Sequence, residues 1–459
     1  MVPNTIPDTA GGQQKQFSAA YSVLNSGIKA RAFPGAAFGM LYRGKVVALD
    51  GVGNFTYAAR SHPDVGPSSD NPASRRAPSS PSAEAVDSHR PEIAEPALGE
   101  ELRAQPVTPF TVYDLASITK VVATTSLAML LYDRGILDLA EPLGDILPGF
   151  VIGMEPGSGK GRVTLRMLLA HCSGLPGYAP LFETHSTPRQ VLRACLRLPL
   201  QTQPDERVEY SDIGFILLGT AIEVLSGQNF ASLCTREVLG PLGMTMTRFC
   251  PPKDWRDSIP PTERDTIFRH RVIQGEVHDE NCFALDGAAG HAGLFSNARD
   301  LLRFAHCILE GGKTPEDRRS DSETRAHSDA ANSVWTIPPE TDSAERASRK
   351  PGTQVFGVQL FRRETVDLFA RRQKIPAGTS RALGWDTPSA PSTSGSMFSA
   401  NSIGHLGFTG TSLWIDRERE LAVALLTNRT WPTRDGAVAT RDIFRQARSD
   451  FHDAVCRAL

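Results

Sequence analysis

The clearest catalytic candidate in the sequence is a serine followed three positions later by a lysine, at Ser117 and Lys120. Residues three apart share one helical turn, so the ammonium is within reach of the hydroxyl. A serine is a poor nucleophile until a base takes its proton, and a lysine can act as that base once burial lowers its pKa. If Ser117 opens a helix, its backbone N–H is also available to bind an oxyanion.

The S-x-x-K spacing has low specificity on its own, since a chain of this length contains it roughly once or twice by chance. A second copy runs from Ser26 to Lys29, at the end of a predicted helix and beside Gly27, and is typical of a surface segment. Ser117 instead precedes an apolar run that begins at Val121, which places it at the start of a buried helix.

Two further segments could complete a site with this pair. Tyr210-Ser211-Asp212 precedes an apolar helix; Asp212 could simply be the N-cap of that helix, or Tyr210 could direct its phenol at the serine and lysine and relay protons to a leaving group. The glycine-rich run from Gly404 to Gly410 is either a turn-rich strand edge or a strand that lines a substrate cleft, since its glycines allow close backbone approach.

The elements that must position these residues follow from hydrophobic periodicity and turn residues. Strands predicted at both ends of the chain around a helical middle favour one antiparallel sheet with an inserted helical lobe. The predicted helices cover residues 14–29, 117–134, 164–170, 187–197, 212–226, 230–238 and 441–459, and the predicted strands cover 36–42, 46–52, 403–407, 412–416 and 420–427.

Composition narrows the class of protein. The 459 residues carry 49 Lys+Arg against 51 Asp+Glu, a formal charge of −2, which argues against binding nucleic acid or a membrane surface through bulk charge. No apolar run approaches the ~20 residues of a membrane span. No signal peptide is visible at the N-terminus, and seven cysteines without a CxxC pair favour reduced thiols, many of them buried. We expect a cytoplasmic protein, or a periplasmic or secreted one if the N-terminus has been trimmed.

Three segments have the composition of mobile insertions, because they hold too few apolar groups to offset the entropy of ordering. They are residues 58–107, 313–352 and the shorter 388–396. We therefore expect a discontinuous sheet domain formed by 1–57 and 286–459, and a mainly helical lobe formed by 108–285. The sequence has no HExxH motif and no paired histidines, so we expect no metal and no cofactor.

Taken in order, these motifs resemble the serine β-lactamase and penicillin-binding-protein superfamily, on its class C-like, esterase-bearing side. The shared order is S-x-x-K at Ser117, Y-S-[ND] at Tyr210 and [KH]-x-G at His405. The resemblance covers nearly all of the chain except the insertions. Its supporting segments are TVYDLA (111–116), LLAHCSGLP (168–176), PLGM (241–244), GHAGLFS (290–296) and TSLWID (411–416).

The resemblance implies an α+β, β-lactamase/transpeptidase-like fold, with a mostly antiparallel sheet flanked by N- and C-terminal helices and a helical lobe. It implies a Ser117 nucleophile, with Lys120 and Tyr210 as acylation base and proton relay. The oxyanion hole would be the backbone N–H groups of Ser117 and Phe408, and water would clear the acyl-enzyme.

Departures from the family pattern bear on mechanism and substrate. Asp212 stands where asparagine is usual; a carboxylate there would raise the pKa of Lys120, unless it is hydrogen-bonded elsewhere, shares a proton, or leaves more of the base role to Tyr210. His405 and Leu406 stand where lysine and threonine commonly help to hold a substrate carboxylate. Neutral imidazole and isobutyl groups offer less to an anion.

We therefore expect weak handling of penicillin-like or D-Ala-terminal carboxylates and better handling of uncharged esters or amides. Turnover of an anionic substrate should improve relative to that of a neutral one as the pH falls towards about 6, where an ordinary imidazole becomes charged. Together with Asp212, His405 and Gly407, His291 is a candidate substrate-binding residue, since it could supply the missing polar contact from its glycine-flanked loop.

The sequence thus predicts a serine hydrolase that acts on small-molecule esters or amides through an acyl-enzyme. A β-lactamase or D-Ala-type cell-wall peptidase is the alternative within enzymes. A catalytically weak member of the same fold that serves binding or assembly is the alternative outside them. The oligomeric state and the natural substrate do not follow from the sequence.

Overall fold

The computed structural model describes residues 10–57, 102, 104–315, 358–434 and 438–459. Most of the two longer predicted insertions, 58–107 and 313–352, therefore lies outside the described residues. The last residues of the first predicted insertion, which the structure describes, pair with the end of the β-hairpin near the N-terminus. Pro106 bridges to Asn54, and the N–H of Val107 donates to the carbonyl of Gly53 at 3.0 Å.

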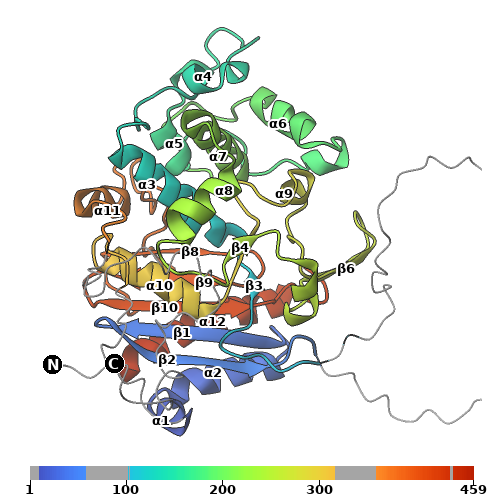
Figure 1. The fold of residues 1–459 in the computed structure, drawn as a ribbon, viewed down its shortest axis with the longest axis vertical. Coiled ribbons are helices and arrows are strands. Elements are labelled where there is room, and N and C mark those ends of the chain that lie inside the picture. The colour runs from blue at the N-terminus through green and yellow to red at the C-terminus, as the bar shows by residue number, and fades with distance from the viewer. Residues whose placement is uncertain (1–9, 58–101, 103, 316–357, 435–437) are drawn as a thin grey trace, which may run out of the picture.

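A five-stranded antiparallel sheet forms the base of the molecule, in the order β2-β1-β10-β9-β8 (Figure 1). Two strands come from the beginning of the chain and three from its end, which confirms the predicted sheet. The bounds are β1 (Gly35–Tyr42), β2 (Lys45–Gly53), β8 (Ser402–Leu406), β9 (Ser412–Asp416) and β10 (Leu421–Thr427).

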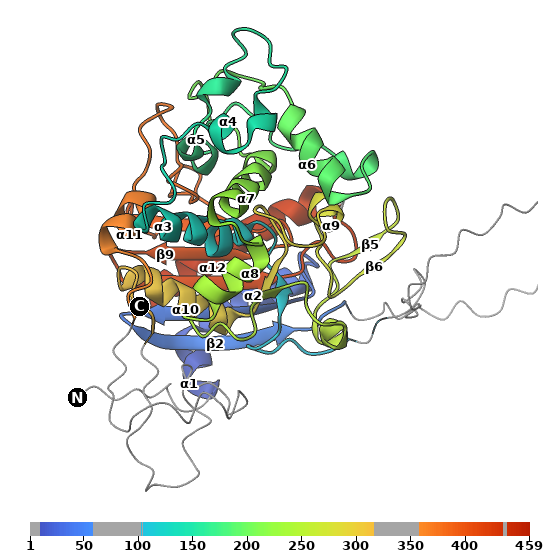
Figure 2. The ribbon, with the colours of Figure 1, turned by 45° about the horizontal axis from the view of Figure 1, so that its top comes forward.

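Both faces of this sheet are buried, and the alternation of side chains along each strand divides them. In β10, Val423 and Leu425 pack with α2 (Ser18–Lys29) and α12 (Val438–Ala458). Their neighbours Ala424 and Leu426 belong to the core on the opposite face, where α10 (Ala298–Leu309) lies (Figure 2). A central strand covered on both sides needs a continuous apolar run, and the sequence of β10 is one.

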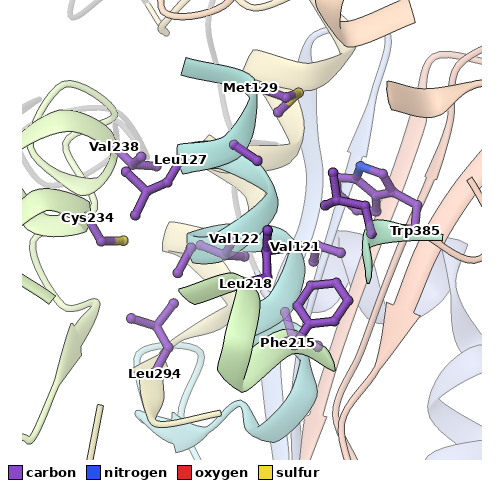
Figure 3. Close-up of a cluster of buried hydrophobic side chains, with 14 of the residues drawn as sticks. Val121, Val122, Leu127, Met129, Phe215, Leu218, Cys234, Val238, Leu294 and Trp385 are labelled. Atoms are coloured by element: carbon purple, nitrogen blue, oxygen red, sulfur yellow. The ribbon is translucent and has the colours of Figure 1, made fainter. Parts of the chain in front are cut away.

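The helical lobe lies beyond the β8 edge of the sheet (Figure 1). Its core packs Val121, Val122 and Leu127 against Phe215 and Leu218 (Figure 3). The helices of the lobe are α3 (Ser126–Asp133), α4 (Leu143–Ile146), α5 (Leu165–Leu169), α6 (Pro188–Arg197), α7 (Asp212–Ser226), α8 (Phe230–Cys234) and α9 (Glu280–Ala284).

Shorter elements complete the described chain. The remaining α-helices are α1 (Ala10–Gln16) and α11 (Arg363–Ala370), and the remaining strands form two small sheets, β3-β7-β4 and β5-β6. Their bounds are β3 (Tyr113–Asp114), β4 (Arg248–Phe249), β5 (Glu263–Asp265), β6 (Arg271–Ile273) and β7 (Leu294–Ser296).

The predicted continuous helix over 117–134 is wrong in its first half. A 3₁₀ turn, η1 (Ala116–Ile118), leads into a π-helix, η2 (Lys120–Thr125), and only then into α3. The hydroxyl of Thr125 donates to the carbonyl of Lys120 at 2.8 Å, and that of Ser126 donates to the carbonyl of Val121 at 3.1 Å. These bonds reach back five residues and match the wider turn, which is common near functional sites. Apolar periodicity does not distinguish the two helix types.

The shortest predicted insertion, 388–396, is described, and its end packs against the C-terminal helix. Ser394 is fully buried, and the backbone N–H and hydroxyl of Ser396 both donate to Asp453 of α12 at 2.7 Å. Polar contacts, rather than apolar burial, fix this segment, which is why its composition suggested a free loop. Within the described part of the chain, no single helix is long and apolar enough to span a membrane. Residues 212–226 and 230–239 pass that test only as a pair, bent by 76°.

We predict that Phe38→Ala lowers the free energy of unfolding by about 3–5 kcal/mol. Phe38 is fully buried, and its ring makes edge contacts with Tyr21 at 5.3 Å and with Phe451 at 5.6 Å, so truncation leaves a cavity between β1, α2 and α12. Urea denaturation measures the change. Ile152→Ala, at a side chain 76% exposed, is the control and should stay within about 0.5 kcal/mol. A loss below about 1 kcal/mol for Phe38→Ala would contradict this packing.

Candidate active site

Three chain segments converge on the Lys120 ammonium. Its Nζ donates to Ser117 Oγ at 2.9 Å, to Asp212 Oδ1 at 2.7 Å and to the carbonyl oxygen of His291 at 2.9 Å. The Lys120 side chain is fully buried. An ammonium has three N–H donors, and here each one has an acceptor. The structure therefore brings the predicted serine and lysine together and holds the lysine in its charged form.

The charge of Lys120 decides which part it can take in catalysis. Burial works to lower the pKa of Lys120, but the Asp212 carboxylate and the Tyr210 hydroxyl outweigh it, and the pKa ends above its ordinary value of 10.5. The sequence left three options open for Asp212, and the structure excludes the one in which it is hydrogen-bonded away from Lys120. A protonated lysine has no lone pair with which to deprotonate the serine, so this charge state favours an electrostatic role over that of a base.

Asp212 is not the N-cap of α7. Ser211 is the cap, since its hydroxyl accepts from the N–H of Gly214 at 2.9 Å, and Asp212 is the first residue of the helix. The helix start thus fixes the backbone of Asp212 and leaves its carboxylate free to face Lys120. The side chain keeps 20% exposure, and its pairing with Lys120 places it in the cluster around Ser117.

A strained turn presents Ser117, the predicted nucleophile. Ala116, directly before Ser117, has φ +47°, a conformation that L-residues rarely adopt. The Asp114 carboxylate holds this turn because it accepts from the N–H of Ala116 at 2.8 Å and from the N–H of His278 at 2.6 Å. Burial raises the pKa of Asp114 to about 6. The strain at Ala116 persists because Asp114 fixes the turn from both sides.

The proposed oxyanion donors lie on two segments that are tied together. Thr409 Oγ1 donates to the carbonyl of Asp114 at 2.8 Å, and Thr411 Oγ1 donates to that of Leu115 at 2.9 Å. Among the described residues, neither Ser117 N–H nor Phe408 N–H has a hydrogen-bond acceptor. Both N–H groups are therefore available to an incoming oxyanion, and the two threonines hold their relative position.

Gly407 makes this close approach possible because it has no side chain. A Cβ at this position would collide with the hydroxyl of Thr411 and with the carbonyl of Leu115. Its own N–H donates to the carbonyl of Thr411 at 2.7 Å. The structure shows Gly407 packing the oxyanion loop against the turn before Ser117, and its predicted contact with substrate stays a prediction.

The Tyr210 side chain lies over the catalytic lysine, with Lys120 Nζ 5.0 Å from its ring centroid. Burial raises the pKa of Tyr210, and the Lys120 cation offsets this only in part, so the resting group is a neutral phenol. The ring stacks at 4.6 Å on the imidazole of His171, which the sequence reasoning passed over. His171 Nδ1 accepts from the N–H of Ser211 at 3.0 Å, so it positions both Tyr210 and the start of α7.

His405 does not act as a proton-sensitive anion contact. Its Nδ1 lies 2.8 Å from the carbonyl of Leu406, and the side chain is buried beside Tyr210. Burial, then the cations of Lys120 and Arg381, hold the pKa of His405 well below its usual range. The expectation that it charges towards pH 6 is therefore wrong, because two fixed positive charges face it.

The His291 side chain contacts Asp279 through one ring nitrogen only, since its buried Nδ1 has no hydrogen-bond partner among the described residues. Its Nε2 lies 2.9 Å from Asp279 Oδ1, and its side chain is almost fully buried. Although burial works in the other direction, the His291 imidazole holds the pKa of Asp279 well below its usual range. Thr124 Oγ1 anchors the preceding carbonyl of Gly290 at 2.5 Å. These contacts fix the loop whose carbonyl accepts from Lys120, so His291 is a positioning residue.

Arg381 supplies a cation that the sequence reasoning missed. Its Cζ lies 5.4 Å from the Tyr210 ring centroid, and its only ion pair in the described part of the chain is a long one, 3.9 Å to Asp386. The side chain keeps 18% exposure. No local motif marks this arginine, because a loop between α11 and β8 carries it to the site from outside the recognised segments.

The described residues contain no group of three or more histidine, cysteine, aspartate or glutamate side chains arranged to hold a metal ion. The site contains the Ser117 hydroxyl, the Lys120 ammonium, the neutral phenol of Tyr210 and two backbone N–H groups without an acceptor among the described residues. That set fits nucleophilic attack on a carbonyl carbon, with stabilisation of the resulting oxyanion.

Comparison with known proteins agrees with this geometry. A family model described as Beta-lactamase matches residues 22–448. An N-acetylmuramyl-L-alanine amidase from Bacillus subtilis is 31% identical over 361 residues, which cover 72% of this chain and 71% of the relative. A putative D-alanyl-D-alanine carboxypeptidase from Escherichia coli K12 is 31% identical over 358 residues, which cover 72% of each.

Solved structures show the same fold at low sequence identity. A penicillin-binding protein homologue from Caulobacter crescentus superposes with a TM-score of 0.61 at 16% identity, over 100% of this chain and 99% of that one. This likeness and the family match confirm the α+β, β-lactamase/transpeptidase-like architecture that the sequence predicted.

We predict that Asp212→Asn moves the alkaline limb of the kcat/KM profile to lower pH. Asp212 raises the pKa of Lys120, and the raised pKa keeps the ammonium present as pH rises. With the carboxylate gone, the charged form is lost at a lower pH. Hydrolysis of a neutral ester followed from pH 5 to 11 measures the shift, with Asp205→Asn, outside the site, as control. Had the lysine been the base, the acid limb would move instead and activity at neutral pH would rise.

Proposed function

This chain belongs to the beta-lactamase family, whose members are serine hydrolases, and from that premise we propose that Ser117 is the nucleophile that carries its acyl-enzyme. The observation that supports this most strongly is the 2.9 Å hydrogen bond from the buried Lys120 ammonium to Ser117 Oγ. An ammonium that donates to the serine oxygen stabilises negative charge developing there. Carboxylic esters and amides are the substrates on which such a nucleophile acts.

Acylation in this site proceeds by proton relay rather than through a free base. The Ser117 hydroxyl passes its proton to the phenol oxygen of Tyr210 as its oxygen bonds to the carbonyl carbon, and Tyr210 passes its own proton to the leaving oxygen or nitrogen. Tyr210 ends the step as it began, so neither a phenolate nor a neutral lysine has to exist beforehand. Lys120 remains a cation throughout and stabilises the serine and tyrosine oxygens.

Deacylation uses the same groups in reverse. A water molecule attacks the acyl carbon and gives its proton to Tyr210, while Tyr210 returns a proton to Ser117 Oγ as the ester bond breaks. The N–H groups of Ser117 and Phe408 hold the oxyanion in both half-reactions. The covalent intermediate thus divides one difficult hydrolysis into two similar steps.

The cation at Arg381 changes the substrate preference expected from the sequence. His405 is neutral, but Arg381 lies beside it and presents a guanidinium over Tyr210. Guanidinium groups bind carboxylates through paired N–H donors. We propose that Arg381 receives a carboxylate close to the scissile bond, which favours peptide-like and β-lactam substrates over the uncharged esters preferred from the sequence alone.

A catalytically weak binding protein is the rival function. A site without catalysis has no need to hold a serine, a charged lysine and a phenol within contact of one another, or to keep the turn at Ala116 strained. These features favour an active hydrolase.

We predict that a fluorophosphonate adds once to the native chain and not to Ser117→Ala. The Lys120 ammonium and the two free N–H groups activate a single hydroxyl, so intact-mass measurement should show one adduct on the native protein. The same measurement with a penicillin separates lactam binding from esterase behaviour. Ser26→Ala, in the second S-x-x-K, is the control and should label like the native protein. A native chain that neither reagent labels, under conditions that label a known serine hydrolase, would favour the binding scaffold.

We predict that Arg381→Leu lowers kcat/KM about tenfold for an ester with a carboxylate near the scissile bond, and much less for the matching carboxamide. The ratio of the two substrates in the native protein should stay constant from pH 8 to pH 6, because Arg381 and Lys120 keep their charge and His405 stays neutral. Steady-state kinetics on the substrate pair measures both. A ratio that rises towards pH 6, or one that Arg381→Leu leaves unchanged, would refute this assignment of Arg381.

A further inference from the structure

Two arginines outside the catalytic cluster share one aromatic ring. Arg429 follows β10, and its Cζ lies 5.8 Å from the ring centroid of Phe444; Arg448, on α12, has its Cζ 5.5 Å from the same centroid. Two more arginines on α12, Arg441 and Arg445, act on this pair electrostatically. Four positive charges therefore gather between the end of β10 and the start of α12.

Arg448 is buried and Arg429 is half-buried, and neither has a counter-charge among the described residues. Arg448 is 6% exposed, its Nε has no hydrogen-bond partner, and no described carboxylate lies within ion-pair distance of Arg448 or Arg429. Burial, then the neighbouring arginines, lower the pKa of each to about 10. Nearby, Arg445 differs because it pairs with Asp442 and is largely exposed. A buried charge without a partner is costly, so such a pair needs an anion to neutralise it.

The cluster adjoins the oxyanion loop. Arg429 Cζ lies 4.8 Å from the ring centroid of Phe408, whose side chain is half exposed, and the N–H of Arg429 donates to the carbonyl of Thr409 at 2.9 Å. The aliphatic stem of Arg429 packs on Gly410, where an added Cβ would lie 2.8 Å from its Cγ. An anion held by Arg429 would thus lie beside the Phe408 ring of the oxyanion loop.

We propose that Arg429 and Arg448 form an oxyanion-binding site beside the catalytic loop, which takes a carboxylate or phosphate group. The planar guanidinium group matches both ligands through paired hydrogen bonds. The anion comes either from the distal end of a substrate or from a free small molecule. Binding there neutralises the charges of Arg429 and Arg448. It also stabilises the position of Phe408, because Arg429 packs on Gly410 and on the Phe408 ring.

Titration of the full chain with inorganic phosphate by calorimetry, in a buffer of low ionic strength, tests this site directly. We expect one phosphate per chain. Arg448→Met should weaken binding at least tenfold, while Arg445→Met, which removes an equal charge from the exposed, paired arginine, should weaken it less than about threefold. Arg429→Met repeats the test at the other arginine of the pair. A native chain without phosphate binding up to tens of millimolar, or variants that bind like the native chain, overturns the proposal.

A stability measurement adds an independent readout. Without phosphate, Arg448→Met should melt at or above the native temperature, because a methionine of similar volume removes an uncompensated buried charge. Phosphate should raise the melting temperature of the native chain and not that of Arg448→Met. A large loss of stability in this variant without phosphate would instead assign Arg448 a structural role and overturn the proposal.

Kinetics distinguishes the two sources of the anion. Phosphate that competes with a carboxylate-bearing ester, and loses this effect in Arg429→Met, supports a site for the substrate's distal group. Phosphate that changes the turnover of neutral and anionic esters alike, again only when Arg429 is present, supports a free effector. The binding and stability measurements need no turnover, so failure of the anion site and failure of the hydrolase function remain separable.

Discussion

The site depends on the coordination of one buried ammonium. Lys120 has three N–H donors, and their acceptors come from Ser117, from Asp212 at the start of α7 and from the His291 carbonyl. A buried cation is tolerated only when its donors are satisfied, so these three segments have to meet. The π-helix that begins at Lys120, the Ser211 cap and the Asp279–His291 contact each fix one side of this arrangement.

The mechanism follows from the same constraint. In the proposed mechanism Asp212 keeps Lys120 charged, so the lysine acts as an electrostatic stabiliser and Tyr210 transfers the protons. The edge of the sheet supplies the other half of the site, because Thr409 and Thr411 tie the oxyanion loop to the strained turn before Ser117. Arg381 beside Tyr210 and Arg429 beside Phe408 add further positive charge next to this centre.

Much of this could be predicted from sequence, because the signals were local. The apolar run in β10, the hairpin of β1 and β2 and the whole of α7 appear in the structure close to their predicted bounds. Ordered motifs also identified Ser117, Lys120 and Tyr210. The π-helix, the neutral state of His405 and the place of Arg381 could not be predicted. Each depends on groups that are distant in the sequence. Hydrophobic periodicity does not report hydrogen bonds from hydroxyl groups to backbone carbonyls, nor charges that approach each other only in the folded chain.

The charge state of Lys120 is the central claim, and nuclear magnetic resonance measures it directly. The native chain with ¹³C-labelled lysine, titrated from pH 6 to 11 and assigned by comparison with Lys120→Arg, reports the protonation of each side chain through its Cε shift. The account predicts that the Lys120 signal keeps its protonated shift past pH 10, where an ordinary lysine, with a pKa of about 10.4, has begun to titrate. A Lys120 signal that titrates below about pH 8 would contradict it, since that lysine could then serve as the base.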